Sequence, residues 1–192
     1  ANSRIVDADI AEEVAEMVRQ QVLQQAFDLL AEDALSQPRV CVHRDYHSRN
    51  LMRAEQHNPG ILDYQDAVIG PVTYDLVSLL KDAYIRWPLE QVDRWVASYA
   101  ELALRYGLID AEQESQFQRW FDLMGLQRHI KVAGIFARLY RRDGKHGYLA
   151  DIPRVLDYIV EMRARHPEFA GLAALIEERV RPGLENLASG MD

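Results

Sequence analysis

The sequence of 192 residues predicts a mainly α-helical protein with one small β-hairpin insert. Two observations predict this fold class. Along most of the chain, apolar residues recur at three- and four-residue steps, which is the period of an amphipathic helix. The exception lies between Pro38 and Tyr74, where short β-rich runs alternate with turn residues. A chain of this length can bury one good core, so we expect a single domain over residues 1–192.

The first part of the chain is expected to be one long helix followed by the β segment. Apolar spacing predicts the helix over residues 7–35, and Pro38 ends it. Short β-rich runs are expected at residues 39–43, 51–53 and 60–63. Asn58-Pro59-Gly60 supplies the turn between the last two. The domain is therefore divided into a leading helix (1–37), a loop and hairpin segment (38–66) and a helical subdomain (67–192).

The rest of the chain is expected to be helical after a loop at residues 64–74, which contains Gly70-Pro71. Pro88 suits the first turn of a helix, and Gly107 suits the position just after its end. Asp110 and Gln113 have the spacing of a capping box. The predicted helices cover residues 73–86, 88–106, 111–142, 153–165 and 167–179.

The composition excludes several classes of protein. With 48% apolar and 27% charged residues the chain is expected to fold. The net charge of −8 argues against a nucleic acid partner, because such binders carry a basic surface. The single cysteine, Cys41, is expected to be buried in a strand, and its lack of a pairing partner fits a reducing, cytoplasmic location. No signal peptide or membrane-spanning segment is expected.

One motif carries the chemistry. Residues 43–50 have the pattern H-R-D-x-x-x-x-N, and Asp63 follows thirteen residues later. This pattern is typical of the catalytic loop and metal-binding aspartate of kinase-type phosphotransferases. Asp45 is the candidate base for the acceptor hydroxyl, and Asn50 and Asp63 are candidate Mg²⁺ ligands with hard oxygen donors. A hairpin between them places Asn50 and Asp63 at the same open end.

Other polar residues near the motif have candidate roles. We expect His43 and Asp75 to hold the catalytic loop in place, Asp75 from the start of the following helix. His47 is assigned to the same structural role, with a position near the transferred phosphate as the alternative. Asp66 lies in the loop that faces the expected cleft, so it either contacts the substrate or stabilises a turn.

The spacing after the motif points to a small-molecule acceptor. Only eleven residues separate Asp63 from Asp75. That interval has no room for the activation segment and peptide-docking platform of a protein kinase. The sequence also lacks A-P-E, and D-Y-Q replaces D-F-G. We therefore expect a phosphotransferase that acts on the hydroxyl group of a small molecule.

Longer stretches around the motif resemble the aminoglycoside phosphotransferase family, a kinase-like group whose catalytic loop is H-x-D-x-x-x-x-N. The resemblance is closer to a bacterial branch of anomeric sugar kinases of cell-wall recycling. That branch phosphorylates N-acetylmuramate and N-acetylglucosamine at the anomeric hydroxyl with ATP. The resemblance is carried by residues 43–52, 62–67, 70–80, 126–131, 134–139, 143–145 and 151–156.

The resemblance implies Asp45 as the base, Asn50 and Asp63 as Mg²⁺ ligands, and ATP and an amino sugar as substrates. An acidic sugar would require a nearby cation, and the candidates are Arg49, Arg128 and Lys131. Arg128 is taken as a substrate-binding residue. The family also has an N-terminal lobe that covers the nucleotide phosphates.

No such nucleotide-binding lobe is visible in the sequence, because the residues before His43 contain neither lysine nor glycine. We therefore expect the C-terminal lobe of a protein-kinase-like, aminoglycoside phosphotransferase fold without its N-terminal lobe. Such a chain is expected to turn over ATP poorly when it is alone.

Three alternatives remain open at this stage. In the first alternative, the chain belongs to a kinase whose acceptor is an aminoglycoside or another small alcohol. In the second, His43, Asp45 and His47 alternate along a straight strand and, with Asp63, bind a transition metal for phosphoester hydrolysis. In the third, the chain is a non-catalytic helical module derived from a kinase lobe.

Overall fold

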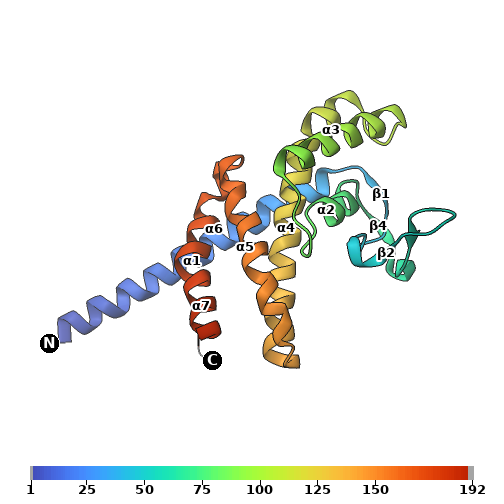
Figure 1. Ribbon diagram of the computed structural model, residues 1–192. Coiled ribbons are helices and arrows are strands. Elements are labelled where there is room, and N and C mark those ends of the chain that lie inside the picture. Colours follow the sequence, from blue (N-terminus) through green and yellow to red (C-terminus); the bar gives the residue numbers. More distant parts are fainter. Residues whose placement is uncertain (1, 190–192) are drawn as a thin grey trace. The chain divides into compact units, whose positions relative to one another are not determined.

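The computed structural model describes residues 2–189 of the chain (Figure 1). These residues are mainly helical, with two small antiparallel sheets of two strands each. The fold class predicted from the sequence, helices with a small β-hairpin insert, is confirmed. The chain forms two compact units, one of residues 30–156 and one of residues 1–29 with 157–192. None of the described helices combines the length and the apolar character that a membrane crossing requires.

α1 (Asn2–Ser36) is the predicted leading helix. It ends before Pro38, because proline disfavours helical backbone at the residue that precedes it. The predicted apolar face is buried only in part. Ala26 and Leu30 are buried, whereas Met17 is 61% exposed. The apolar spacing therefore predicts the helix correctly, but it does not predict which of its side chains are covered.

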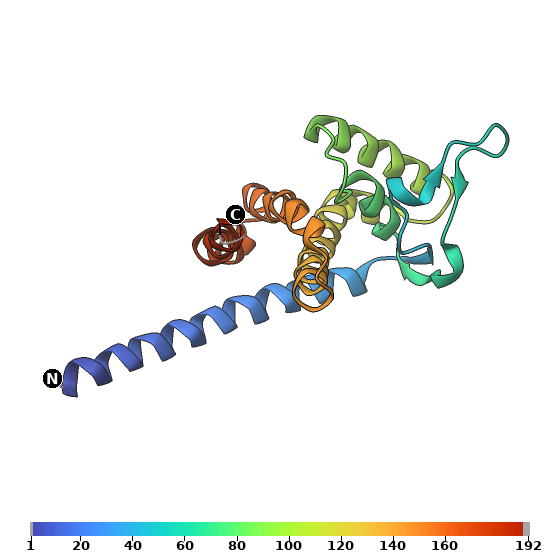
Figure 2. The same ribbon diagram turned by 60° about the horizontal axis from the view of Figure 1, so that its bottom comes forward.

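The β segment contains two antiparallel strand pairs. β2 (Leu51–Met52) and β3 (Gly60–Ile61) form the predicted hairpin. Their connecting loop extends away from the rest of the 30–156 unit, as Figure 2 shows. β1 (Arg39–Val42) pairs with β4 (Val68–Pro71) instead of with the hairpin. Two strand pairs therefore flank the catalytic-loop motif.

β4 corrects the loop predicted for residues 64–74. Gly70-Pro71 suggested a turn, but Pro71 occupies the last position of the strand, where its missing N–H disturbs little of the ladder. Gly70 is explained by close packing, since a Cβ atom there would lie 2.7 Å from Cγ2 of Val42. The expectation of a buried Cys41 is also wrong, because the alternation along β1 buries Val42 and leaves Cys41 exposed.

α2 (Tyr74–Leu80) is shorter than the helix predicted for residues 73–86. The backbone leaves helical geometry at Lys81, which has φ −114° and ψ 45°. The Asp82 side chain then accepts a hydrogen bond from the backbone N–H of Tyr84 at 2.9 Å. This local bond competes with helix continuation and ends α2 early.

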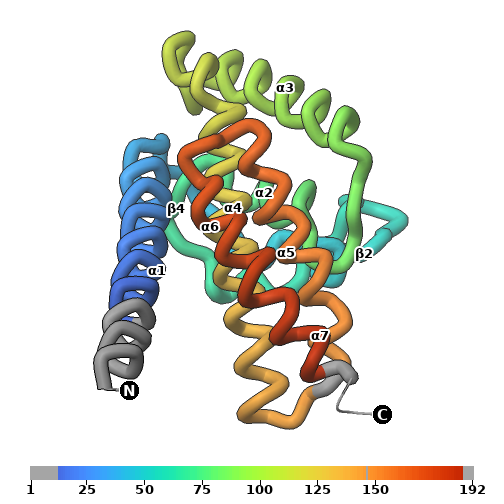
Figure 3. The backbone as a smooth tube through the Cα atoms, turned by 90° about the vertical axis from the view of Figure 1, so that its left-hand side faces the viewer, coloured from blue at the N-terminus to red at the C-terminus, as the bar shows by residue number. Residues whose placement is uncertain are grey.

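α3 (Leu89–Arg105) and α4 (Ala111–Asp143) have the ends that the sequence predicts. Gly107 has φ +69°, and the N–H groups of Gly107 and Leu108 bond back to the last turn of α3, a Schellman motif. Asp110 and Gln113 form the predicted capping box. α3 packs against the first half of α4 (Figure 3). The core here includes Val77, Val96, Ala100, Phe117, Trp120 and Phe121.

Shorter helical elements complete the chain. η3 (His146–Asp151) leads into α5 (Ile152–Glu161) and η4 (Met162–Ala164), where the sequence predicts a helix over 153–165. The last helix is predicted over 167–179, but helical backbone continues well beyond it. It is built from η5 (Pro167–Phe169), α6 (Ala170–Leu175), a π-helical turn (Ile176–Val180) and α7 (Arg181–Ser189).

The close approach of β4 to β1 gives a test of the fold. Gly70→Ala forces the new Cβ against Val42, so we expect the free energy of unfolding to fall by about 1–3 kcal/mol. Gly134→Ala is the matched control: it lies in α4 with nothing within 4 Å of a new Cβ, and alanine there should stabilise by about 0.5–1 kcal/mol. Urea unfolding measures both. Equal midpoints for Gly70→Ala and the unmodified chain would contradict the packing of β4.

Candidate active site

The catalytic-loop motif begins with a sharp change of backbone direction. β1 ends at Val42, and Arg44 has φ +77°, a left-handed conformation that is unusual for a side chain of this size. The Asp75 carboxylate holds this turn. It accepts hydrogen bonds from the backbone N–H of His43 at 2.6 Å and of Arg44 at 3.0 Å. The first turn of α2 therefore fixes the start of the loop.

This turn removes the geometry behind the metal-hydrolase alternative. The prediction that His43, Asp45 and His47 alternate along a straight strand is wrong, because the strand ends at Val42 and Arg44 reverses the chain. In the described part of the chain, no group of three or more His, Cys, Asp or Glu side chains is placed to hold a metal ion.

His43 joins the catalytic-loop motif to the β2–β3 hairpin. Its Nδ1 accepts a hydrogen bond from the backbone N–H of Asp45 at 3.3 Å, and its Nε2 lies 2.8 Å from the carbonyl oxygen of Leu62. A nitrogen that accepts carries no proton in the neutral ring, so Nε2 is the donor to Leu62. The side chain thus connects the residue before Asp63 to the candidate base.

Asn50 bonds to Asp45 and to the residue before Asp63. Its side-chain Nδ2 donates to the backbone carbonyl oxygen of Asp45 at 3.0 Å. Its backbone carbonyl oxygen accepts a hydrogen bond from the N–H of Leu62, also at 3.0 Å. Because Leu51 pairs with Ile61, Asp63 follows at the open end of the hairpin, beside Asn50. Asp63 has φ +63°, and its carboxylate accepts a hydrogen bond from the side chain of Gln65.

These side chains fit a magnesium ion. With its Nδ2 used by Asp45, Asn50 keeps Oδ1 as the atom to offer to a cation. Asp63 adds an exposed carboxylate. Hard oxygen donors from one or two side chains, completed by phosphate oxygens and water, are what Mg²⁺ requires.

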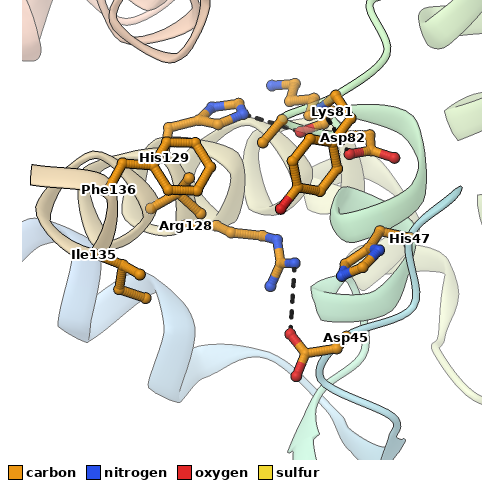
Figure 4. Close-up of a pocket in the computed structure, with 11 residues that line it drawn as sticks. Asp45, His47, Lys81, Asp82, Arg128, His129, Ile135 and Phe136 are labelled. Carbon is orange, nitrogen blue, oxygen red and sulfur yellow. Dashed lines mark hydrogen bonds and ion pairs between the residues drawn. The ribbon is translucent and has the colours of Figure 1, made fainter. Parts of the chain in front are cut away.

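Arg128 reaches the candidate base from α4. Its guanidinium lies 4.0 Å from Oδ1 of Asp45 and donates to the carbonyl oxygen of Arg44 at 3.1 Å and to the hydroxyl of Tyr74 at 3.4 Å. Figure 4 shows Arg128 facing Asp45, with a dashed line between them. The Arg128 side chain is only 11% exposed, while that of Asp45 is 51% exposed. The base is therefore open to an acceptor and has one fixed cation beside it.

Asp82 is an important residue that the sequence reasoning missed. Its carboxylate accepts hydrogen bonds from the N–H of Ser48 at 3.0 Å and from the Ser48 hydroxyl at 2.6 Å. It also accepts from Tyr84 N–H. A signal was present in the sequence, because an acidic residue at the C-terminal end of an apolar helix is unfavourable to the helix dipole. Such a residue needs partners elsewhere, and here they are in the catalytic loop.

A pocket of about 150 Å³ opens beside Asp45. His47 projects into its lining, and burial lowers the pKa of this imidazole against the opposing effect of Asp82. Among the three cations considered for an acidic sugar, Arg128 lines the pocket. Arg49 stacks on the ring of Tyr84 at 3.4 Å, and Lys131 lies 3.5 Å from the Tyr74 hydroxyl.

Asp66 lies apart from this pocket. It ends the exposed turn η2 (Tyr64–Asp66), and its carbonyl oxygen is 3.5 Å from the Arg44 guanidinium. The structure therefore places Asp66 on the hairpin side of the loop, close to Asp63.

A cluster of buried polar side chains lies next to the pocket. Lys81 Nζ pairs with Asp122 at 2.9 Å, and the carbonyl oxygen of Lys81 lies 3.0 Å from Nε2 of His129. Burial, and next the charge of Lys81, lower the pKa of His129 to about 3. His129 is therefore neutral in the folded protein at ordinary pH.

Comparisons with known proteins found a matching family model and similar sequences. The model of the phosphotransferase enzyme family matches residues 2–115, more than half of the chain. A Pseudomonas putida protein named N-acetylmuramate/N-acetylglucosamine kinase is 53% identical over 156 residues, which are 81% of this chain and 45% of that protein. A protein of the same name from Neisseria meningitidis is 51% identical over 172 residues, 90% of this chain and 51% of that protein. The chain spans about half the length of these curated relatives.

The hold of Asp75 on the loop can be tested by Asp75→Asn. The amide offers one acceptor where the carboxylate satisfies two N–H groups, so we expect a loss of about 1–3 kcal/mol in the free energy of unfolding. Amide exchange at His43 and Arg44 should become faster. Asp66→Asn, which changes an exposed carboxylate, is the control. It should leave the free energy of unfolding and the amide exchange rates unchanged. Unaltered exchange at His43 in Asp75→Asn would show that the loop is held by other contacts.

His129 predicts a pH dependence of stability. Its pKa is lower in the folded chain than in the unfolded chain, so its contribution is complete above pH 6.5 and declines as the pH falls towards 3. The decline from pH 7 to pH 5 is expected to be about 2 kcal/mol. His129→Gln should flatten the pH dependence by this amount in urea unfolding series, while His57→Gln on the exposed hairpin loop should not. Equal slopes for the two variants would argue against a buried neutral His129.

Proposed function

Because this chain belongs to the phosphotransferase enzyme family, we propose that it is the catalytic, acceptor-binding lobe of an ATP-dependent sugar kinase. The proposed acceptor is the anomeric hydroxyl of N-acetylmuramate or N-acetylglucosamine, the two sugars in the names of its relatives. The observation that carries the proposal is that Asn50 bonds both to the backbone of Asp45 and to the backbone of Leu62, the residue before Asp63.

Asp45 is proposed as the general base. Its half-exposed carboxylate borders the pocket, where an acceptor hydroxyl can donate a hydrogen bond to it. As the hydroxyl oxygen bonds to the γ-phosphorus, its proton passes to Asp45, and the bond from the γ-phosphorus to the bridging oxygen breaks to release ADP. Arg128, whose guanidinium lies 4.0 Å from this carboxylate, orients it before transfer.

Asn50 and Asp63 are proposed to hold Mg²⁺. When bound, the ion neutralises charge on the phosphates of ATP. The protein's own contribution is orientation: Asn50 is fixed by Asp45 and by the hairpin, and His43 fixes the hairpin to the loop. Asp66, near Asp63, is proposed to contact the substrates from the hairpin side.

The nucleotide requires residues from outside this chain in our proposal. Phosphates are usually covered by a glycine-rich loop and contacted by a lysine. Residues 1–42 contain neither lysine nor glycine, and the chain matches only about half the length of its relatives. We infer that the active enzyme includes an N-terminal lobe that covers the nucleotide, and that this chain alone turns over ATP poorly.

The test uses the full-length gene product with ATP and a panel of free sugars, aminoglycosides and simple alcohols. We expect a phosphate ester of N-acetylglucosamine or N-acetylmuramate. Asp45→Asn should lose about 10²-fold or more in kcat with little change in sugar binding, because only proton acceptance is removed. Asp28→Asn, an exposed carboxylate on α1, should retain full activity.

Near-normal turnover by Asp45→Asn would remove Asp45 from the role of base. Transfer to aminoglycosides or simple alcohols alone would keep the phosphotransferase but change the acceptor.

A further inference from the structure

One imidazole in the active-site pocket has no hydrogen-bonding partner. Neither ring nitrogen of His47 bonds to any of the described residues, and Nδ1 is also shielded from solvent. A buried polar atom without a partner costs free energy, so such atoms are rare and need an explanation. The backbone of His47 belongs to the catalytic loop, but its side chain does not tie the loop together.

The charged side chains that line the pocket are already engaged. Asp82 accepts from Ser48 and Tyr84, and Arg128 binds Asp45 and the carbonyl oxygen of Arg44. Lys81 pairs with Asp122, and its carbonyl oxygen contacts His129. Only the His47 imidazole among these groups has both of its nitrogens unused.

The ring of His47 is nevertheless fixed in position. It meets the ring of Tyr84 edge-on, with centroids 5.8 Å apart and planes at 73°. Tyr84 is itself held by its N–H bond to Asp82 and by the guanidinium of Arg49 over its face. A ring held in this way is ready to bind a ligand without a large loss of conformational entropy.

The two unused ring nitrogens of His47 determine which ligand group fits beside it. A neutral imidazole has one N–H donor and one acceptor nitrogen. Its natural partner is an uncharged group such as an amide or a hydroxyl.

The opposite wall of the pocket is apolar. Figure 4 shows Ile135 and Phe136 across the pocket from His47. Val132 also lines the pocket. Tyr148 packs against Phe136 at 5.1 Å and supports this wall. A small ligand group here needs a polar atom on one side and apolar atoms on the other.

We propose that this pocket receives the N-acetyl group of the acceptor sugar, with His47 as hydrogen-bond partner of its amide and Ile135 and Phe136 against its methyl. This inference rests on the proposed function, because it names the part of the acceptor that the same site recognises. In a 2-acetamido sugar, the acetamido group is on the carbon next to the anomeric hydroxyl. It therefore lies beside Asp45 when that hydroxyl is the acceptor.

The experiment compares N-acetylglucosamine with glucose as acceptors for the full-length gene product. Wild type should have a kcat/KM for N-acetylglucosamine at least about 10-fold above that for glucose, because a site built for an amide rejects the ligand that lacks it. His47→Phe keeps the aromatic contact with Tyr84 and removes the hydrogen bond. It should lower kcat/KM for N-acetylglucosamine by about 10- to 100-fold and change the value for glucose by less than about 3-fold.

Two further variants complete the test. His47→Asn retains a donor and an acceptor on a shorter side chain, so its preference for N-acetylglucosamine should be intermediate. His57→Phe, the same substitution on the exposed hairpin loop, should keep the wild-type ratio. Equal losses for both sugars in His47→Phe and His47→Asn would overturn the inference and return His47 to a structural role.

The failure of this inference and that of the proposed function can be told apart. A wild-type enzyme that phosphorylates both sugars equally well overturns the N-acetyl subsite and leaves the kinase. If no sugar is phosphorylated, the proposed function fails, and NMR titration then decides the subsite. N-acetylglucosamine, but not glucose, should shift the imidazole signals that His47→Phe removes, and the absence of that shift overturns the subsite.

Discussion

The grip of the Asp75 carboxylate on the backbone of His43 and Arg44 is the interaction on which the site depends. It holds Arg44 in a left-handed conformation that a large side chain does not adopt without support. This turn takes the chain out of β1 and directs Asp45 towards the pocket. Asn50 can then reach the carbonyl oxygen of Asp45, and the hairpin pairs Asn50 with Leu62, the residue before Asp63. Because Asp75 lies in the first turn of α2, the helix N-terminus also favours its negative charge.

Side-chain hydrogen bonds to the backbone carry much of this architecture, because the strands are very short. β2 and β3 have two residues each, and a two-stranded hairpin is marginal by itself. His43 secures the hairpin at Leu62, Asp82 secures the loop at Ser48, and Arg128 secures it at Arg44. Three polar side chains from the loop, the end of α2 and α4 thus replace the ladder that a larger sheet would provide. The site is therefore sensitive to single polar substitutions that leave the helical core intact.

The sequence predicted the features that depend on local chemistry. The long helices follow from apolar spacing, and the ends of α3 and α4 follow from Gly107 and from the Asp110–Gln113 capping box. The hairpin follows from its turn residues. Features that depend on distant partners were not predictable in the same way. β4 exists because β1 pairs with it, and the Asp82 carboxylate bonds to Ser48, 34 residues away. The candidate residues of the motif were visible as a pattern, whereas the position of Arg128 beside Asp45 required the packing of α4.

Lys81 helps to fix the position of the catalytic loop relative to the helical core. Its ammonium group is buried with Asp122 of α4, and its carbonyl oxygen contacts His129, also of α4. Gly125 permits this approach, since a Cβ atom there would lie 2.8 Å from Cδ of Lys81. A buried ion pair adds little net stability, but it tolerates few other arrangements of its two helices. The next residue is Asp82, so the same turn of chain that is fixed to α4 also fixes Ser48 and Tyr84. Lys81 and Asp82 are adjacent, but the Lys81 side chain is buried in the core and the Asp82 side chain bonds to the catalytic loop. This short segment therefore determines the shape of the pocket.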